Sequence, residues 1–582
     1  MGLFANCLHN CVREDRLRPK VFWLFFFAFC VIAAGLGLRD PQPADEPRFV
    51  LVAKDMVEQG HWFFPQRGQE LYADKPPLFM WLQAVFFYLV GSWRIAFLLP
   101  SLLASIGTLI CVYDLSRRLW TRRIGCIAVI ALLLAFQFTY QSKRAQIDAL
   151  LVFFITLSNY GLLRHILLGR SWIWWVIGWS AAGLGTISKG VGFLSLLILM
   201  PAAIASTRGW PHVKIHATKW QFWLGPLCFI LTVSLWLGPL CFLVLTSHRP
   251  EYFQYLHEIL FHQTAQRYAH SWDHTHSQFY FLKVMLIYWL PPVLALPWAI
   301  PHWYRRWHRQ DPRFFLPLAW IFIVFVFFSI PDGKRDMYVL PALPMLCICL
   351  APLIPGILRQ PIALRVLQFF TFILIFTLLL AGLVIMTYSR IQTSLIDGRG
   401  LDIETVRWIG LGFAVIACIG AYSFKKWAKR AAHIPLIIVI FSGWILVSLV
   451  IFPCINNASS SKNVMRAVSQ RLGPADQLGL IAWKEQNLLM AARPVTTFGF
   501  LVPWQTQFQQ GVSWQAREPS HRWLLIQEPA LQNCVMREKS VMVGASNRRR
   551  WWLVPSGAIR PQCQPNSGLG VQKKFANNSD TD

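Results

Sequence analysis

Long blocks of apolar residues recur along most of the chain, and they constrain its fold more than any other feature. The blocks run to roughly 17 to 25 residues, which at about 1.5 Å per helical residue matches the roughly 30 Å hydrocarbon core of a bilayer. Of 582 residues, 55% are hydrophobic and only 14% are charged, more apolar surface than a soluble protein of this size needs for its cores. The sequence therefore predicts a polytopic α-helical membrane protein.

About thirteen transmembrane helices are predicted from these blocks. They are 21–38, 94–113, 123–140, 147–168, 172–188, 190–206, 221–246, 279–301, 314–330, 337–356, 362–388, 406–423 and 433–453. An alternative for two of them is a single bent segment, broken around Ser188-Lys189-Gly190.

Two domains are expected. Residues 1–453 form the transmembrane domain, with a long first loop, 39–93, in which the short apolar block from Pro76 to Val90 reads as an interfacial helix. Residues 454–582 mix polar segments with short apolar runs such as 523–526 and 551–554, which indicates a small soluble α/β domain. The polar tail after about Val571 is expected to be disordered.

The net charge of +28 lies largely in short Lys/Arg clusters between the apolar blocks. Such clusters mark cytoplasmic loops under the positive-inside rule, so they indicate topology and not nucleic-acid binding. With a cytoplasmic N-terminus and an odd number of spans, loops 39–93, 247–278 and 389–405 and the C-terminal domain face the outside.

Charged residues on that outer side run against the positive-inside bias and are costly near a membrane without a partner or a function. The set is Asp45, Glu46, Arg48, Asp74, Lys75, Lys143, Arg144, Asp148, Lys189, Asp332, Lys334, Arg335 and Asp336. Cations beside a few carboxylates suit a lipid phosphate and a reaction that needs an acid or base. Any one of these residues could instead be an ordinary solvated loop charge or form a salt bridge.

Several short motifs resemble one known family. They are Asp45-Glu46-Pro47-Arg48, Gly60-His61-Trp62, Lys75-Pro76-Pro77-Leu78, Asp148-Ala149-Leu150-Leu151, Ser188-Lys189-Gly190 and Lys334 to Pro341, in order along most of residues 20 to 350. Together they resemble the lipid-linked-sugar glycosyltransferases related to aminoarabinose transferase and protein O-mannosyltransferase. The chain departs from the family pattern at Asp74, Ser188 and Gln146-Ile147, which bears on the substrate more than on the reaction class.

The resemblance implies a membrane-embedded C-type glycosyltransferase fold, with the first outer loop lying over a cavity between lipid and water. It implies that Asp45 lies at the reaction centre, with Asp148 as the next catalytic candidate. The residues expected to bind substrate are Glu46, Arg48, Asp74, Lys75, Lys189, Arg335 and Tyr338.

By the same resemblance, the donor is a sugar on a polyprenyl phosphate of the undecaprenyl type, and the membrane is the bacterial inner membrane. The expected acceptor is lipid A or a related envelope glycolipid, and a protein acceptor is the alternative. Asp45 would deprotonate an acceptor hydroxyl, or would orient a phosphate acceptor or stabilise positive charge at the sugar carbon. These roles stay open.

No cofactor is expected, because Lys and Arg can stabilise a leaving phosphate without a metal. A divalent metal remains an alternative in the loop from His248 to His276, which holds His257, His262, His270, His274 and His276. Of the 13 cysteines, most lie in apolar blocks. Cys534 and Cys563 could form a disulfide outside the cytoplasm, although Cys454 leaves the pairing open.

A lipid flippase or secondary transporter is the competing class, since many spans with a few buried charges also describe such proteins. Transporters usually show internal repeats and charges at the membrane midplane. Here no repeat is evident and the unusual charges gather at one face, which favours the transferase. A structural scaffold would leave that one-sided set unexplained.

Overall fold

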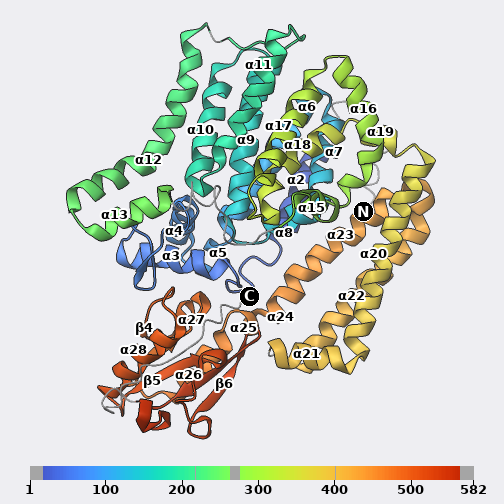
Figure 1. Cartoon of the computed structure of the whole chain (residues 1–582). Coiled ribbons are helices and arrows are strands. Elements are labelled where there is room, and N and C mark those ends of the chain that lie inside the picture. The colour runs from blue at the N-terminus through green and yellow to red at the C-terminus, as the bar shows by residue number, and fades with distance from the viewer. Residues whose placement is uncertain (1–17, 217, 262–275, 400, 564–582) are drawn as a thin grey trace. The chain divides into compact units, whose positions relative to one another are not determined.

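The computed structural model describes residues 18–216, 218–261, 276–399 and 401–563, and it divides into two compact units (Figure 1). The transmembrane unit comprises Met1–Arg67, Leu71–Gln392 and Ile403–Asn456. The C-terminal unit comprises Gly68–Glu70, Thr393–Asp402 and Asn457–Asp582.

Seven helical segments in the described chain are long and apolar enough to cross a bilayer. They are α5–α6 (Trp93–Leu119), α9 (Ile147–Leu167), η3–α12 (Trp220–Ser247), α17 (Pro312–Ser329), α20 (Pro361–Thr387), α22 (Ile403–Ala431) and α23–α24 (His433–Cys454). Two bent pairs raise the number to nine if each is one span: α7 (Arg122–Leu134) with α8 (Phe136–Ser142), and α15 (Tyr280–Tyr288) with η5 (Pro292–Ala295) and α16 (Leu296–His308).

The four other predicted segments are also helical, although they fall outside that set. They are α2 (Arg18–Ala33), α10 (Trp172–Lys189), η2–α11 (Gly192–Ile198 and Leu199–Thr207) and η6–α18 (Asp336–Ala342 and Leu343–Leu350). A helix thus coincides with every predicted span. The predicted fold class, a polytopic helical membrane protein with a small C-terminal α/β region, is confirmed.

The chain turns back between α10 and η2, so the alternative of one bent segment is wrong. Helix α10 ends at Gly190, whose φ of +83° suits glycine because it lacks a Cβ. The backbones of Gly185 and Gly192 then pack together so closely that a Cβ on Gly192 would lie 2.2 Å from the Gly185 carbonyl carbon. In a continuous helix, residues seven positions apart are separated by about 10 Å along the axis, so this contact requires the chain to fold back at Gly190.

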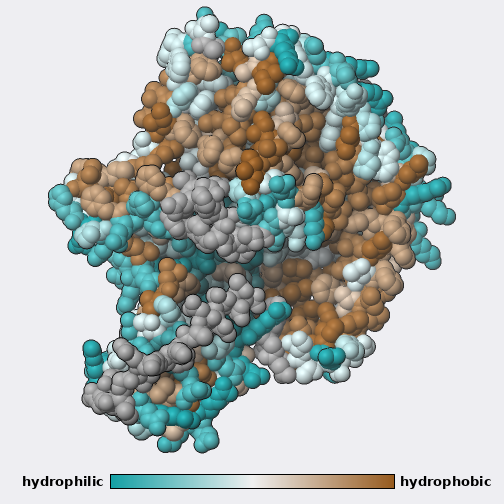
Figure 2. Space-filling view, viewed as in Figure 1, coloured by the Kyte–Doolittle hydropathy of each residue, from teal (hydrophilic) through white to brown (hydrophobic). Residues whose placement is uncertain are grey.

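Helix α20 has an exposed apolar side that is suited to contact with lipid. Its exposed large side chains include Phe369, Phe372, Phe376, Leu380 and Leu383, which recur every three or four residues along one side of the helix. Apolar residues also cover broad areas of the visible flank of the unit (Figure 2). This surface is stable only in a bilayer.

The first loop folds into two short helices and a small hairpin. Helix α3 (Glu46–Gln59) packs Phe49 against Phe79 of α4 (Leu78–Val90), and strands β1 (Gln66–Arg67) and β2 (Glu70–Leu71) lie between them. The predicted block from Pro76 to Val90 therefore forms a helix. Helix α13 (Pro250–His257) of a later loop packs on the same loop, since Tyr252 stacks on Phe64 at 3.6 Å between ring centroids.

Three further helices complete the transmembrane unit and its borders: α19 (Ile354–Ile357), α21 (Ser389–Arg399) and α25 (Asn456–Ser459).

A mixed five-stranded sheet in the order β4-β3-β5-β7-β6 forms the centre of the C-terminal unit. The strands are β3 (Gln477–Ile481), β4 (Val495–Thr497), β5 (Arg522–Gln527), β6 (Val541–Ser546) and β7 (Arg549–Val554), with helices α26 (Lys462–Arg471), α27 (Glu485–Leu489) and α28 (Trp504–Ala516). The two apolar runs singled out in the sequence become β5 and β7, which pair antiparallel. A disulfide joins Cys534 to Cys563, and the polar tail after Val571 lies outside the described residues.

Candidate active site

Asp45 stands directly before the first turn of α3, where Pro47 in the second helical position favours a helix start. Its carboxylate keeps about a quarter of its surface exposed and is held on both oxygens. The Gln146 amide donates to Oδ2 at 3.1 Å, and the guanidinium of Arg48 lies 3.6 Å from Oδ1. Asp45 is therefore fixed in orientation while remaining open to a substrate.

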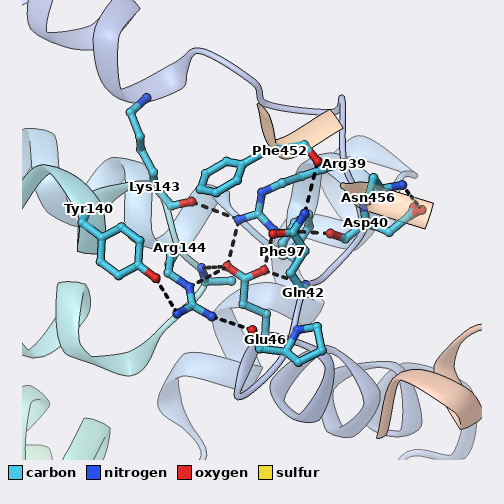
Figure 3. Close-up of polar contacts among 12 residues, drawn as sticks. Arg39, Asp40, Gln42, Glu46, Phe97, Tyr140, Lys143, Arg144, Phe452 and Asn456 are labelled. Atoms are coloured by element: carbon cyan, nitrogen blue, oxygen red, sulfur yellow. Dashed lines mark hydrogen bonds and ion pairs between the residues drawn. The ribbon is translucent and has the colours of Figure 1, made fainter. Parts of the chain in front are cut away.

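Glu46, the next residue, is fully buried, and its carboxylate is saturated with donors (Figure 3). Arg39 binds it with both terminal nitrogens, with Nη2 at 2.8 Å from Oε1. The backbone amides of Gln42 and Ala145 donate to it at 2.8 and 3.0 Å, and Arg144 lies 3.6 Å away. Burial alone would raise the pKa of Glu46, but the two arginines and these hydrogen bonds hold it below its usual value.

The two arginines tie Glu46 to other elements. Arg39 donates to the Lys143 carbonyl at 3.0 Å and lies over the rings of Phe97 and Phe452, each centroid 5.2 Å from the guanidinium carbon. Arg144 donates to the Tyr140 hydroxyl at 3.0 Å. Loop one, the end of α8 and the last transmembrane segment thus meet at one buried carboxylate, which fits the salt-bridge alternative given above for the charged residues of the outer side.

Asp40 forms a second buried contact beside the first. Its carboxylate accepts from Arg94 at 2.7 Å and from the Asn456 side-chain amide at 2.9 Å, while the Asn456 oxygen accepts from the Asp40 backbone at 2.7 Å. We name Arg39, Asp40, Glu46, Arg144 and Asn456 the anchor cluster.

Lys143 lies in the same region, but its side chain points away from Glu46 (Figure 3). The ammonium donates to the carbonyls of Val31 and Ile32 in the last turn of α2, where helix carbonyls lack intrahelical partners. Burial, with repulsion from Arg39, lowers the pKa of Lys143 to about 7. Lys143 therefore caps a helix end.

Tyr72 is a candidate site residue that the sequence analysis missed. It is 1% exposed, and its hydroxyl has no hydrogen-bond partner within the described residues. Burial and the nearby charge of Asp74 raise the pKa of Tyr72, and the charges of Arg48 and Asp45 also reach it. A buried hydroxyl without a partner costs about 1–3 kcal/mol, so this group is available to a ligand.

The two loop residues after Tyr72 include the predicted binding residue Asp74, which lies 3.7 Å from Arg67. The Arg67 guanidinium also lies over the Tyr72 ring at 5.6 Å. Lys75 follows at intermediate exposure and has interactions of its own. Asp45, Arg48, Arg67, Tyr72 and Asp74 thus form one group at the base of the first loop.

Asp148 and Lys189 form an ion pair at the same end of the unit. Asp148 lies in the first turn of α9 and Lys189 is the last residue of α10, and neighbouring antiparallel helices bring such ends together. The Lys189 ammonium also lies 5.3 Å from the centroid of the Tyr338 ring. The structure therefore unites three of the predicted site residues.

One three-residue segment connects the two groups, because Gln146 contacts Asp45 and Asp148 contacts Lys189. Nearby, the charges of Asp148 and Lys189 act on Asp336, and Arg335 precedes it with its Nε buried. Lys334 is turned inward, where it donates to the His276 carbonyl at 3.0 Å. The arrangement places several carboxylates, two tyrosines and several cations along one path.

The histidine loop contributes little that can be described. His262, His270, Asp273 and His274 lie outside the described residues. Within the ranges that are described, no three His, Cys, Asp or Glu side chains are placed to hold a metal ion.

The chain is similar to several known proteins in sequence and in fold. Residues 74–237 match a protein family described as dolichyl-phosphate-mannose-protein mannosyltransferase. The chain is 26% identical over 335 residues to the undecaprenyl phosphate-alpha-4-amino-4-deoxy-L-arabinose arabinosyl transferase of Shewanella sediminis, which covers 56% of this chain and 58% of that protein. The Yersinia pestis protein of the same name is 23% identical over 480 residues, covering 79% and 83%.

In fold, the chain is similar to the crystal structure of ArnT from Cupriavidus metallidurans bound to undecaprenyl phosphate. The TM-score is 0.68 at 18% identity, over 94% of this chain and 100% of that one. The multi-pass architecture and the bacterial relatives identify a bacterial inner-membrane protein. The family match, the relatives and the shared fold together support a place for the chain in the superfamily of membrane-embedded, lipid-linked-sugar glycosyltransferases that contains the aminoarabinose transferases and the protein mannosyltransferases.

Proposed function

We propose that the protein transfers a sugar from an undecaprenyl-type polyprenyl phosphate to lipid A or a related envelope glycolipid on the outer face of the membrane. One observation carries the proposal: the partly exposed Asp45 carboxylate, fixed by Arg48 and Gln146, lies one short segment from the Asp148–Lys189 pair. The names of the arabinosyl transferase relatives support the donor class, a sugar linked to undecaprenyl phosphate.

In the proposed reaction, the bond between the sugar C1 and the phosphate oxygen breaks, and the acceptor oxygen forms a bond to C1. Asp45 takes the proton of an acceptor hydroxyl, or orients the acceptor if that acceptor is a phosphate. The departing polyprenyl phosphate gains negative charge, which the cations Arg48, Lys75, Lys189 and Arg335 are suited to stabilise. Tyr72 and Tyr338 would hydrogen-bond the sugar or its phosphate, and no cofactor takes part.

A protein acceptor is the second candidate, and the match of residues 74–237 to the mannosyltransferase family favours it. The matched segment contains Asp74, Lys75, Asp148 and Lys189 but not Asp45. The glycolipid and protein candidates therefore share a sugar donor linked to a polyprenyl phosphate, and they differ in the acceptor.

The test is transfer by the purified full chain from undecaprenyl phosphate-linked aminoarabinose to lipid A or to serine-rich peptides, read by mass spectrometry. We expect a lipid A product of increased mass, and Lys75→Ala should weaken donor binding most among the cations. Transfer to peptide alone would move the assignment to the second candidate. No transfer to either acceptor, together with normal donor binding by Lys75→Ala, would overturn the donor assignment.

A further inference from the structure

A separate cavity of about 520 Å³ lies in the transmembrane unit between α7, η5, α16, α19, α20 and the junction of α22 with α23. This volume falls within the roughly 300–1,000 Å³ that is usual for ligand sites. We call it the junction cavity. None of the site residues described above lines it.

The junction cavity lies at the opposite end of the unit from Asp45. Helices α7 and α8 run from Arg123, which lines the cavity, to Lys143 beside the anchor cluster. Helices α23 and α24 likewise run from His433, which lines the cavity, to Phe452 beside Arg39. Two independent helical paths therefore separate the cavity from the site.

The charged residues that line the cavity are all basic. Its charged or titratable lining residues are Arg123, Arg359, Arg430 and His433, and its lining contains no Asp or Glu. Arg359 and Arg430 are exposed, and no side-chain hydrogen bond or ion pair joins either of them to the described part of the chain. These guanidinium groups can bind an anion without first giving up an acidic partner.

The rest of the lining is apolar and has the depth of one leaflet. Along α7, the lining residues Arg123, Ile127, Ala131 and Leu134 recur on one side of the helix. At about 1.5 Å per residue, they extend over about 17 Å, close to half of the roughly 30 Å hydrocarbon core. The cationic groups thus stand at one end of a leaflet-deep apolar wall.

We propose that the junction cavity binds an anionic glycerophospholipid of that leaflet, with its headgroup phosphate on Arg359 and Arg430 and an acyl chain along α7. A free phosphate would leave the apolar wall uncovered. The polyprenyl phosphate of the proposed reaction presents its phosphate at the opposite end of the unit, near Asp45. The basic lining of the cavity and the depth of its apolar wall together therefore favour a structural phospholipid. This inference does not depend on the proposed function.

The experiment is native mass spectrometry of the detergent-purified full chain with added phosphatidylglycerol, phosphatidylethanolamine, undecaprenyl phosphate or inorganic phosphate. Wild type should retain phosphatidylglycerol in preference to phosphatidylethanolamine. Because one basic side chain near a lipid surface contributes about fivefold in affinity, Arg359→Gln should lower retention about fivefold, and Arg359→Gln with Arg430→Gln roughly twenty-five-fold.

Arg365→Gln is the matched control, since Arg365 is an exposed arginine near the start of α20 that does not line the cavity. It should retain the lipid as wild type does. Thermal unfolding of each variant without added lipid separates lost binding from lost folding, and a variant that fails this check is replaced by Arg430→Gln alone. Equal retention of the two phospholipids, equal loss in Arg365→Gln, binding of inorganic phosphate alone, or displacement by undecaprenyl phosphate would each overturn the proposal.

Discussion

Asp45 and Glu46 are adjacent in the chain, yet their carboxylates have opposite surroundings. Glu46 accepts from Arg39 and two backbone amides, forms an ion pair with Arg144 and is closed to solvent. Asp45 has one amide donor and one distant guanidinium, and it remains open. At the scale of single residues, one carboxylate organises the loop and the other faces the substrate.

The first prediction concerns Asp45→Asn, which keeps the shape of the side chain but loses charge and basicity. Transfer should fall by about 10²–10⁴-fold, the usual contribution of a general base, while donor binding and unfolding temperature stay close to wild type. Glu58→Gln is the control, because Glu58 is exposed and its ion pair is with Lys54, away from the site. Full activity in folded Asp45→Asn would move the catalytic role to Asp148.

Glu46→Gln should act on stability first, because it leaves Arg39 and Arg144 buried near a neutral group. Breaking a buried ion pair by removing one partner costs about 3–5 kcal/mol. The measurement is the unfolding temperature in detergent, compared with Asp45→Asn. Equal stability of the two variants would contradict the anchoring role of Glu46.

Lys143 should make stability depend on pH. Its pKa is about 7 in the folded protein against an ordinary 10.5, so the unfolded chain binds more protons between those values. Stability should therefore rise with pH above 7, by up to about 1.4 kcal/mol per unit. Unfolding followed from pH 7 to pH 9 should show this rise in wild type and a smaller one in Lys143→Met; identical slopes would refute the assignment.

Part of the site can be predicted from single residues and part cannot. Asp45, Asp148 and Lys189 stand out in the sequence because charges beside apolar blocks are costly. Arg39 and Asp40 carry a similar signal, directly after the first block, but the sequence analysis did not single them out. The burial of Tyr72 and the contact of Asp40 with Asn456 depend on tertiary packing, which no local pattern records.

At the scale of elements, the site is built from helix ends. The start of α3, the end of α8, the start of α9 and the end of α10 supply Asp45, Arg144, Asp148 and Lys189. The ends of apolar blocks can be located in a sequence to within a few residues, which is why these positions were predicted. The bends between α7 and α8 and between α15 and α16 were not predicted, because a bend inside an apolar block leaves its hydropathy unchanged.

The close contact of α10 with η2 gives a prediction at this scale. Gly192→Ala places a Cβ against the backbone of Gly185, which must shift and carry Lys189 with it. We expect a loss of about 1–3 kcal/mol in stability, as for other overpacked cores, together with weaker donor binding. Gly443→Ala in α23 is the control, since nothing lies within 4 Å of its Cβ, and similar behaviour of both variants would contradict the role of the contact.

At the scale of the whole molecule, the sequence analysis anticipated the helical membrane fold and the C-terminal sheet. It anticipated the disulfide only as one pairing among several. The pairing of Cys534 with Cys563, 29 residues apart, is set by the fold of the C-terminal unit. Spacing alone could not distinguish it from pairings with Cys454.

The last prediction is that the C-terminal unit lies outside the cytoplasm, where disulfides form. A periplasm-active reporter fused to the C-terminus should be active, and a cytoplasm-active one silent. Removing the disulfide with Cys534→Ser should cost the unit about 3–4 kcal/mol, the value expected for a loop of this size. Free-thiol labelling of both cysteines in the native protein, or a C-terminal reporter active only in the cytoplasm, would contradict this topology.

The contact between Asp40 and Asn456 also bears on how the protein is made. The two residues are 416 positions apart, so at roughly 5–20 residues per second a ribosome needs about 20–80 s to proceed from one to the other. For most of that interval, the first loop is already translated while a partner of Asp40 is still missing. We therefore expect a nascent chain to gain transferase competence only when its last helix has been inserted, so that products of premature termination are inactive.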